Sequence, residues 1–85
     1  DSLIRALRFL QLIGKFKEIP VTVSTLGDGG FSLRFQKNYR EYVDVDIYNG
    51  DNTIVFLHSQ TGKEVEAFDL SIQETANKLK EVIGG

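Results

Sequence analysis

The stretch Glu41–His58 constrains the fold more than any other part of this 85-residue chain. Polar and apolar residues alternate before Asn49-Gly50, and an apolar run follows it. Asn-Gly between two such runs is the strongest short-range signal for a β-hairpin, because both residues tolerate the positive φ angles of a type I′ turn. The sequence therefore predicts a pair of antiparallel strands at the centre of the fold.

The loop length sets the register of this hairpin. A two-residue loop pairs Val45 with Ile54 and Val43 with Phe56, whereas a four-residue loop shifts the pairing by two residues. Because side chains alternate with a period of two, both registers give the same two faces. The predicted core face holds Val43, Val45, Ile47, Ile54 and Phe56. The predicted outer face holds Tyr42, Asp44, Asp46, Tyr48, Asp51, Thr53, Val55 and Leu57.

Two helices and three further strands are predicted around the hairpin. The apolar pattern predicts a helix over residues 2–13 with a broad apolar arc, and Ser71 with Glu74 forms a capping box that opens a final helix. Alternation predicts strands over residues 20–26, 31–36 and 64–70. A turn near Tyr39 brings the second strand back beside the hairpin, with Arg34 near Asp44 on the outer face.

The facing of the last strand stays open. A two-residue loop at Thr61-Gly62 turns Val65 and Ala67 inward, and a three-residue loop turns Phe68 and Leu70 inward. We favour the second because it buries the larger side chains.

The order helix, five short strands, helix predicts an α+β fold of two layers. An antiparallel meander sheet of four to five strands carries both terminal helices on one face, and the other face meets water. We expect residues 1–85 to form a single domain.

Composition narrows the class of partner. Net charge is −2, with both signs spread along the chain, so we do not expect a nucleic-acid partner. The chain has no cysteine, which fits a cytoplasmic protein, and its start does not resemble a secretory signal. No apolar run is long enough for a membrane span. The chain lacks methionine, which indicates trimming or a segment of a longer protein.

Chemical motifs are weak throughout. His58 is the only histidine, and Asp69 is a carboxylate that comes near it only in some registers, so it is expected to be structural. Asp44 and Asp46 point the same way along one strand and do not converge on a metal. The glycine-rich segment at residues 27–30 precedes a strand rather than a helix, which is not the context of a phosphate-binding loop. We therefore expect no catalytic residue, metal or cofactor.

The outer face of the sheet is the best candidate for function. Tyrosines flank aliphatic residues and carboxylates there, a composition that favours a protein contact. The predicted binding residues are Tyr42, Asp44, Asp46, Tyr48, Val55 and Leu57. We expect a small non-enzymatic protein-interaction domain: an adaptor, an inhibitor or immunity-type protein, or a subunit of a larger assembly.

Three alternatives remain. The chain could be a homodimerisation domain of a larger protein that uses the apolar arc of its first helix. It could be a nucleic-acid module that uses Arg5, Arg8, Lys15 and Lys17. The least favoured alternative is a weak enzyme or ligand binder built on Asp46, Tyr48 and His58.

Overall fold

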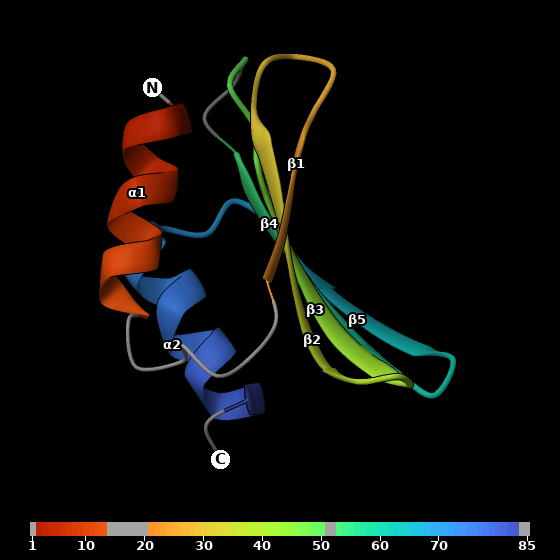
Figure 1. Cartoon of the computed structure of the whole chain (residues 1–85). Coiled ribbons are helices and arrows are strands. Elements are labelled where there is room, and N and C mark those ends of the chain that lie inside the picture. Colours follow the sequence, from red (N-terminus) through yellow and green to blue (C-terminus); the bar gives the residue numbers. More distant parts are fainter. Residues whose placement is uncertain (1, 14–20, 51–52, 84–85) are drawn as a thin grey trace.

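A computed structural model describes residues 2–13, 21–50 and 53–83 of the chain (Figure 1). Helix α1 precedes the strands and helix α2 follows them. The elements are α1 (Ser2–Leu12), β1 (Val21–Thr25), β2 (Phe31–Asn38), β3 (Glu41–Ile47), β4 (Ile54–Gln60), β5 (Lys63–Ala67) and α2 (Ile72–Ile83). The predicted α+β order, helix then five strands then helix, is confirmed.

The five strands form one antiparallel sheet in the order β1-β2-β3-β4-β5. Both helices lie on the same side of this sheet (Figure 1). Helix α1 packs chiefly over β2 and β3, and α2 packs over β4 and against α1. The inner face of the sheet is therefore covered along its middle strands, while the described helices leave the outer face open.

The core lies between the helices and the inner face. Phe9 of α1 meets Phe35 of β2 edge-to-face, with ring centroids 6.0 Å apart. Helix α2 contributes Ala76 and Leu79, and Thr75 is buried beside them because its hydroxyl donates to the Ser71 carbonyl. The predicted core residues of the hairpin are all buried: Val43, Val45, Ile47, Ile54 and Phe56.

The central hairpin has the register of the four-residue loop. The prediction of a two-residue type I′ turn at Asn49-Gly50 is therefore wrong. Ile47 pairs with Ile54, and the Tyr48 amide donates to the Thr53 carbonyl. A tertiary contact explains the difference. Asp28, in the β1–β2 loop, accepts hydrogen bonds from the backbone amides of Asn49 and Gly50, each at 3.0 Å. These two amides are anchored to a neighbouring loop, and neither residue has positive φ.

The last strand also differs from the favoured prediction. His58 pairs with Val65 and Phe56 with Ala67, so the two-residue loop at Thr61-Gly62 is correct. Thr61 and Gly62 have φ angles of 50° and 82°, the positive values that a type I′ turn needs at both central residues. Phe68 is left exposed, whereas Leu70, beyond the end of β5, is half-buried against the core as predicted.

The predicted capping box of α2 is confirmed. The Glu74 amide donates to the Ser71 hydroxyl at 3.1 Å, and the Ser71 amide donates to the Glu74 carboxylate at 3.0 Å. The second bond stabilises the ionised carboxylate and lowers the pKa of Glu74.

Two further findings concern the surface. No helix of the described residues is long and apolar enough to cross a membrane. The broad apolar arc predicted for α1 leaves several large side chains exposed, namely Leu3, Ile4, Leu7 and Leu12. The predicted strand start at Pro20, the lysines at 15 and 17, and Asp51 lie outside the described residues.

Candidate protein-interaction surface

Strands β3 and β4 carry five of the six predicted binding residues on the outer face of the sheet, and Tyr48 directly follows the end of β3. Asp44 lies opposite Leu57, and Asp46 lies opposite Val55. Tyr42 lies opposite Ser59, one pair further along β3. All six predicted residues are half-buried rather than fully exposed: Tyr42, Asp44, Asp46, Tyr48, Val55 and Leu57.

Two polar contacts organise the β2–β3 part of this face. Arg34 Nε and Nη2 donate to the two carboxylate oxygens of Asp44 at 2.7 and 2.8 Å, which confirms the predicted ion pair. The paired carboxylate raises the pKa of Arg34. The guanidinium also lies 4.0 Å from the centroid of the Tyr42 ring. Ser32 donates to Asp46 at 2.6 Å. These contacts hold Tyr42, Asp44 and Asp46 in fixed positions.

The β4–β5 part of the face is more acidic than sequence reasoning expected. Glu66 lies opposite Leu57 and Glu64 lies opposite Ser59, so both carboxylates belong to the outer face. Sequence reasoning missed them because it assigned the wrong facing to the last strand. Within the described strands, the outer face holds four carboxylates and one guanidinium: Asp44, Asp46, Glu64, Glu66 and Arg34.

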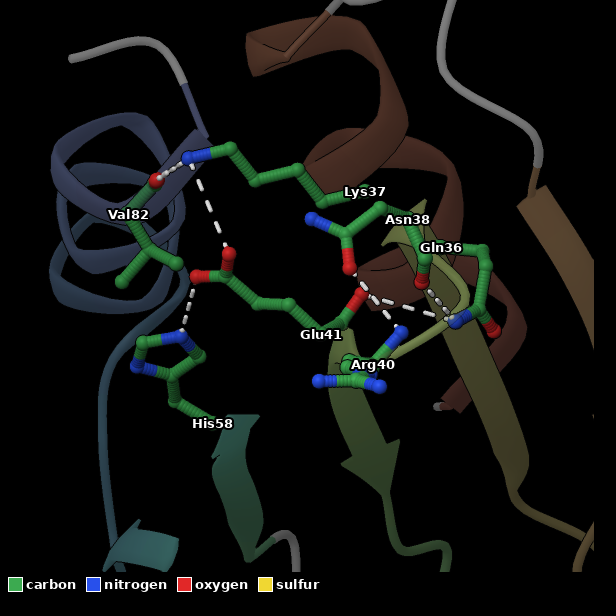
Figure 2. A network of polar contacts seen from close by, with 7 residues as sticks. All are labelled: Gln36, Lys37, Asn38, Arg40, Glu41, His58 and Val82. Carbon is green, nitrogen blue, oxygen red and sulfur yellow. Dashed lines mark hydrogen bonds and ion pairs between the residues drawn. The ribbon is translucent and has the colours of Figure 1, made fainter. Parts of the chain in front are cut away.

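A separate polar cluster lies at the inner side of the sheet, next to the C-terminal turn of α2 (Figure 2). Glu41 is buried, at 8% exposure, and its carboxylate lies 2.8 Å from Nε2 of His58. The Lys37 ammonium lies 4.0 Å from the other Glu41 oxygen and donates to the Val82 carbonyl at 3.1 Å. His58 thus has the carboxylate partner that the sequence did not reveal. Strand alternation puts Glu41 on the core side, and that was the available signal.

The cluster does not assemble the residues of the enzyme hypothesis. His58 lies on the inner face of the sheet, whereas Asp46 lies on the outer face. A pocket of about 150 Å³ adjoins His58 between β5 and α2, lined in part by Val65, Lys78 and Val82. Within residues 2–13, 21–50 and 53–83, no three acidic or histidine side chains gather as metal ligands.

The predicted basic side of α1 is also altered by packing. The Arg5 guanidinium donates to the Tyr48 carbonyl, so this arginine ties α1 to the end of β3. Arg8 is exposed. The other two basic residues considered for nucleic-acid binding, Lys15 and Lys17, lie outside the described residues.

Comparison of the chain with protein-family models, curated proteins and solved structures gives no match in any of the three. The fold and the geometry of the surface therefore carry the functional argument.

Proposed function

We propose that the chain is a small non-enzymatic protein-interaction domain that binds a partner through the outer face of its sheet. An adaptor, an inhibitor or immunity-type protein, and a subunit of a larger assembly all fit this proposal. The observation that carries it is an outer face left open by both helices, with Val55 and Leu57 set among four carboxylates. A cytoplasmic location is part of the proposal, and fractionation of cells that express a tagged chain tests it.

The charge of this face favours a basic partner. Leu57 lies between Asp44 on β3 and Glu66 on β5, and Val55 lies beside Asp46. Lysine and arginine side chains can cover apolar surface with their methylene stems while their charged ends pair with carboxylates. Complementary charge of this kind speeds association and weakens with added salt. We therefore expect binding that falls as ionic strength rises.

The variants Val55→Lys and Leu57→Lys test the proposal. Each new lysine would face a carboxylate across the strands, an arrangement that sheets tolerate, so both variants are expected to fold. Val65→Lys is the matched control, because it makes the same change on the opposite face of the sheet, at an exposed position. The probe is the set of proteins that the wild-type chain captures from a lysate of its own source cells.

The expected result is capture that Val55→Lys and Leu57→Lys lose and Val65→Lys retains, and that added salt weakens. Amide resonances that shift on adding the captured partner should map to β3 and β4. Equal capture by all three variants would exclude the outer face as the binding surface.

A further inference from the structure

Strand β1 forms an edge of the sheet and carries no charge. Among the described strands its one neighbour is β2, and its sequence is Val-Thr-Val-Ser-Thr, with four β-branched residues of five. The other edge strand, β5, carries Lys63, Glu64 and Glu66. Charged side chains are a common means by which proteins prevent an edge from pairing with another chain. The β5 edge has this protection and β1 does not.

The inner side of β1 is apolar and poorly covered. Val21 and Val23 face the same way as Phe35 and Leu33, their buried partners on β2, yet they are 39% and 56% exposed. The reason is the position of α1, which packs chiefly over β2 and β3. The uncovered strip therefore runs along the free edge of the sheet.

Helix α1 carries a further exposed apolar residue on the flank that does not face α2. Arg8 and Leu12 line a cleft shared with Ile72 and Gln73, so this flank of α1 faces α2. Helical geometry puts Leu7 on a different flank of α1 from Arg8 and Leu12, and so away from α2. Leu7 is half-exposed. Exposed apolar side chains are therefore present on this flank of α1 as well as on β1.

We propose that β1 pairs with β1 of a second copy of this chain, antiparallel and about a two-fold axis at Val23, to form a continuous ten-stranded sheet. Val23 then lies opposite its own counterpart, and Val21 lies opposite Thr25 of the second copy. On the outer face Thr22 lies opposite Ser24, a pair whose hydroxyls hydrogen-bond across strands. This register keeps the inner faces of both sheets on one side, so both apolar strips are covered together.

The charge pattern selects this occupant over other pairings of the same edges. A two-fold pairing of β5 with itself about Val65 would set Glu64 opposite Glu66, a like-charge contact. Pairing β1 with β5 of another copy would leave an open edge at each end and grow into a filament. Self-pairing of β1 closes after two copies and brings only uncharged residues together.

The proposed dimer goes beyond the interaction surface argued above and does not depend on it. None of the β1 residues belongs to the set of six predicted binding residues on the outer face. The two outer faces would lie on the same side of the ten-stranded sheet, so a partner with repeated basic segments would meet two sites at once. If a variant that stays monomeric still captures the partner, the binding surface on the outer face is supported independently of the dimer. The two proposals can therefore be tested separately.

Light scattering over about a hundredfold range of concentration tests the dimer. The wild-type chain should pass from monomer to dimer mass. Val23→Lys places two like charges face to face at the two-fold axis and should weaken the dimer about tenfold or more. Val65→Lys, at a position on the other edge that is also more than half exposed, should leave the dimer unchanged. A wild-type chain that stays monomeric throughout, or equal effects of the two variants, would overturn the proposal.

Cross-linking tests the register directly, because the chain has no cysteine of its own. Residues directly opposite in an antiparallel pair have Cα atoms about 4.5–5.5 Å apart, within the range of a disulfide. Val23→Cys should therefore oxidise to a covalent dimer. Thr22→Cys should not, since the same residue of the second copy would lie diagonally across, beyond about 7 Å. Efficient cross-linking of Thr22→Cys, or none of Val23→Cys, would refute the proposed two-fold axis.

Discussion

The carboxylate of Glu41 and the imidazole of His58 join β3 to β4 through a 2.8 Å hydrogen bond on the buried side of the sheet. A carboxylate oxygen is an acceptor, so Nε2 of the imidazole is the donor in this contact. Lys37 extends the contact to the C-terminal turn of α2 through the Val82 carbonyl (Figure 2). Three neighbouring strands, β2, β3 and β4, are therefore connected to helix α2 around one buried acidic side chain.

Glu41→Gln should lower the free energy of unfolding by about 1–3 kcal/mol, because a buried polar network loses a bond while its other members stay in place. The amide of glutamine brings a donor toward either Lys37 or His58, both of which are donors. Urea unfolding followed by circular dichroism measures the change. Glu64→Gln, on exposed β5, is the control and should stay within about 0.5 kcal/mol of wild type. Equal stability of the two variants would show that the Glu41 contact contributes nothing.

Much of the fold could be predicted because its signals are local. Alternation in β3 and β4 set the faces, and Ser71 with Glu74 set the start of α2. The registers of two hairpins could not be predicted with the same success. The register of the β3–β4 hairpin depends on Asp28, which is more than twenty residues from its partners Asn49 and Gly50. A local sequence pattern does not predict a contact over that separation.

The candidate surface was predicted in part for the same reason. Alternation placed Asp44 and Leu57 on one face whatever the loop length, and the Arg34 pair followed from the β2–β3 register. The acidic residues of β5 were missed because the last strand was assigned by side-chain size. Side-chain size favoured burying Phe68. The positive φ angles of Thr61 and Gly62 instead give a two-residue turn, and this turn sets a register that leaves Phe68 exposed.

Asp28 should make stability depend on acid pH. Its carboxylate accepts backbone amides of Gly50, Gly30 and Asn49, and these bonds hold its pKa below the ordinary value of 3.8. A group whose pKa is lower in the folded state stabilises the fold above its unfolded pKa and loses this contribution as pH falls through the folded pKa. Wild type should therefore lose stability as the pH falls below about 4.

The comparison with Asp28→Asn isolates this contribution, because Glu74 also has a lowered pKa and contributes to acid sensitivity in both chains. Wild type should be the more stable chain near neutral pH, and the gap should close under acid conditions. Thermal unfolding at a series of pH values measures it. A gap that stays constant with pH would mean that the ionised carboxylate is not what anchors the two loops.

Gly30→Ala should be far more costly than Gly27→Ala, although the two glycines belong to one loop. A Cβ atom at position 30 would overlap the Ile47 carbonyl oxygen and approach the Tyr48 Cα to 3.0 Å. Overpacking against backbone costs about 1–3 kcal/mol or more. A Cβ atom at position 27 meets nothing within 4 Å, so that substitution should be neutral or stabilise by up to about 1 kcal/mol. Urea midpoints of the two variants give the comparison, and similar losses in both would contradict it.

Thr61 offers a route to a more stable chain. It is a β-branched residue at φ 50°, a conformation in which branching at Cβ is disfavoured, and its amide donates to the Arg40 carbonyl of the neighbouring turn. Asparagine tolerates this conformation and, followed by Gly62, gives the preferred pair for a type I′ turn. Thr61→Asn should therefore raise the free energy of unfolding by about 0.5–1 kcal/mol while keeping the backbone bond to Arg40.

Gly62→Ala is the opposing variant for the same turn. Nothing within 4 Å would meet its Cβ atom, so any loss must come from the positive φ of 82° rather than from a clash. We expect a loss of about 1 kcal/mol or more, since a residue with a Cβ atom is strained at that angle. Opposite signs for the two variants in thermal unfolding would identify backbone conformation as the property that fixed the register of β5. Two changes of the same sign would require that the β4–β5 pairing is held by its side chains instead.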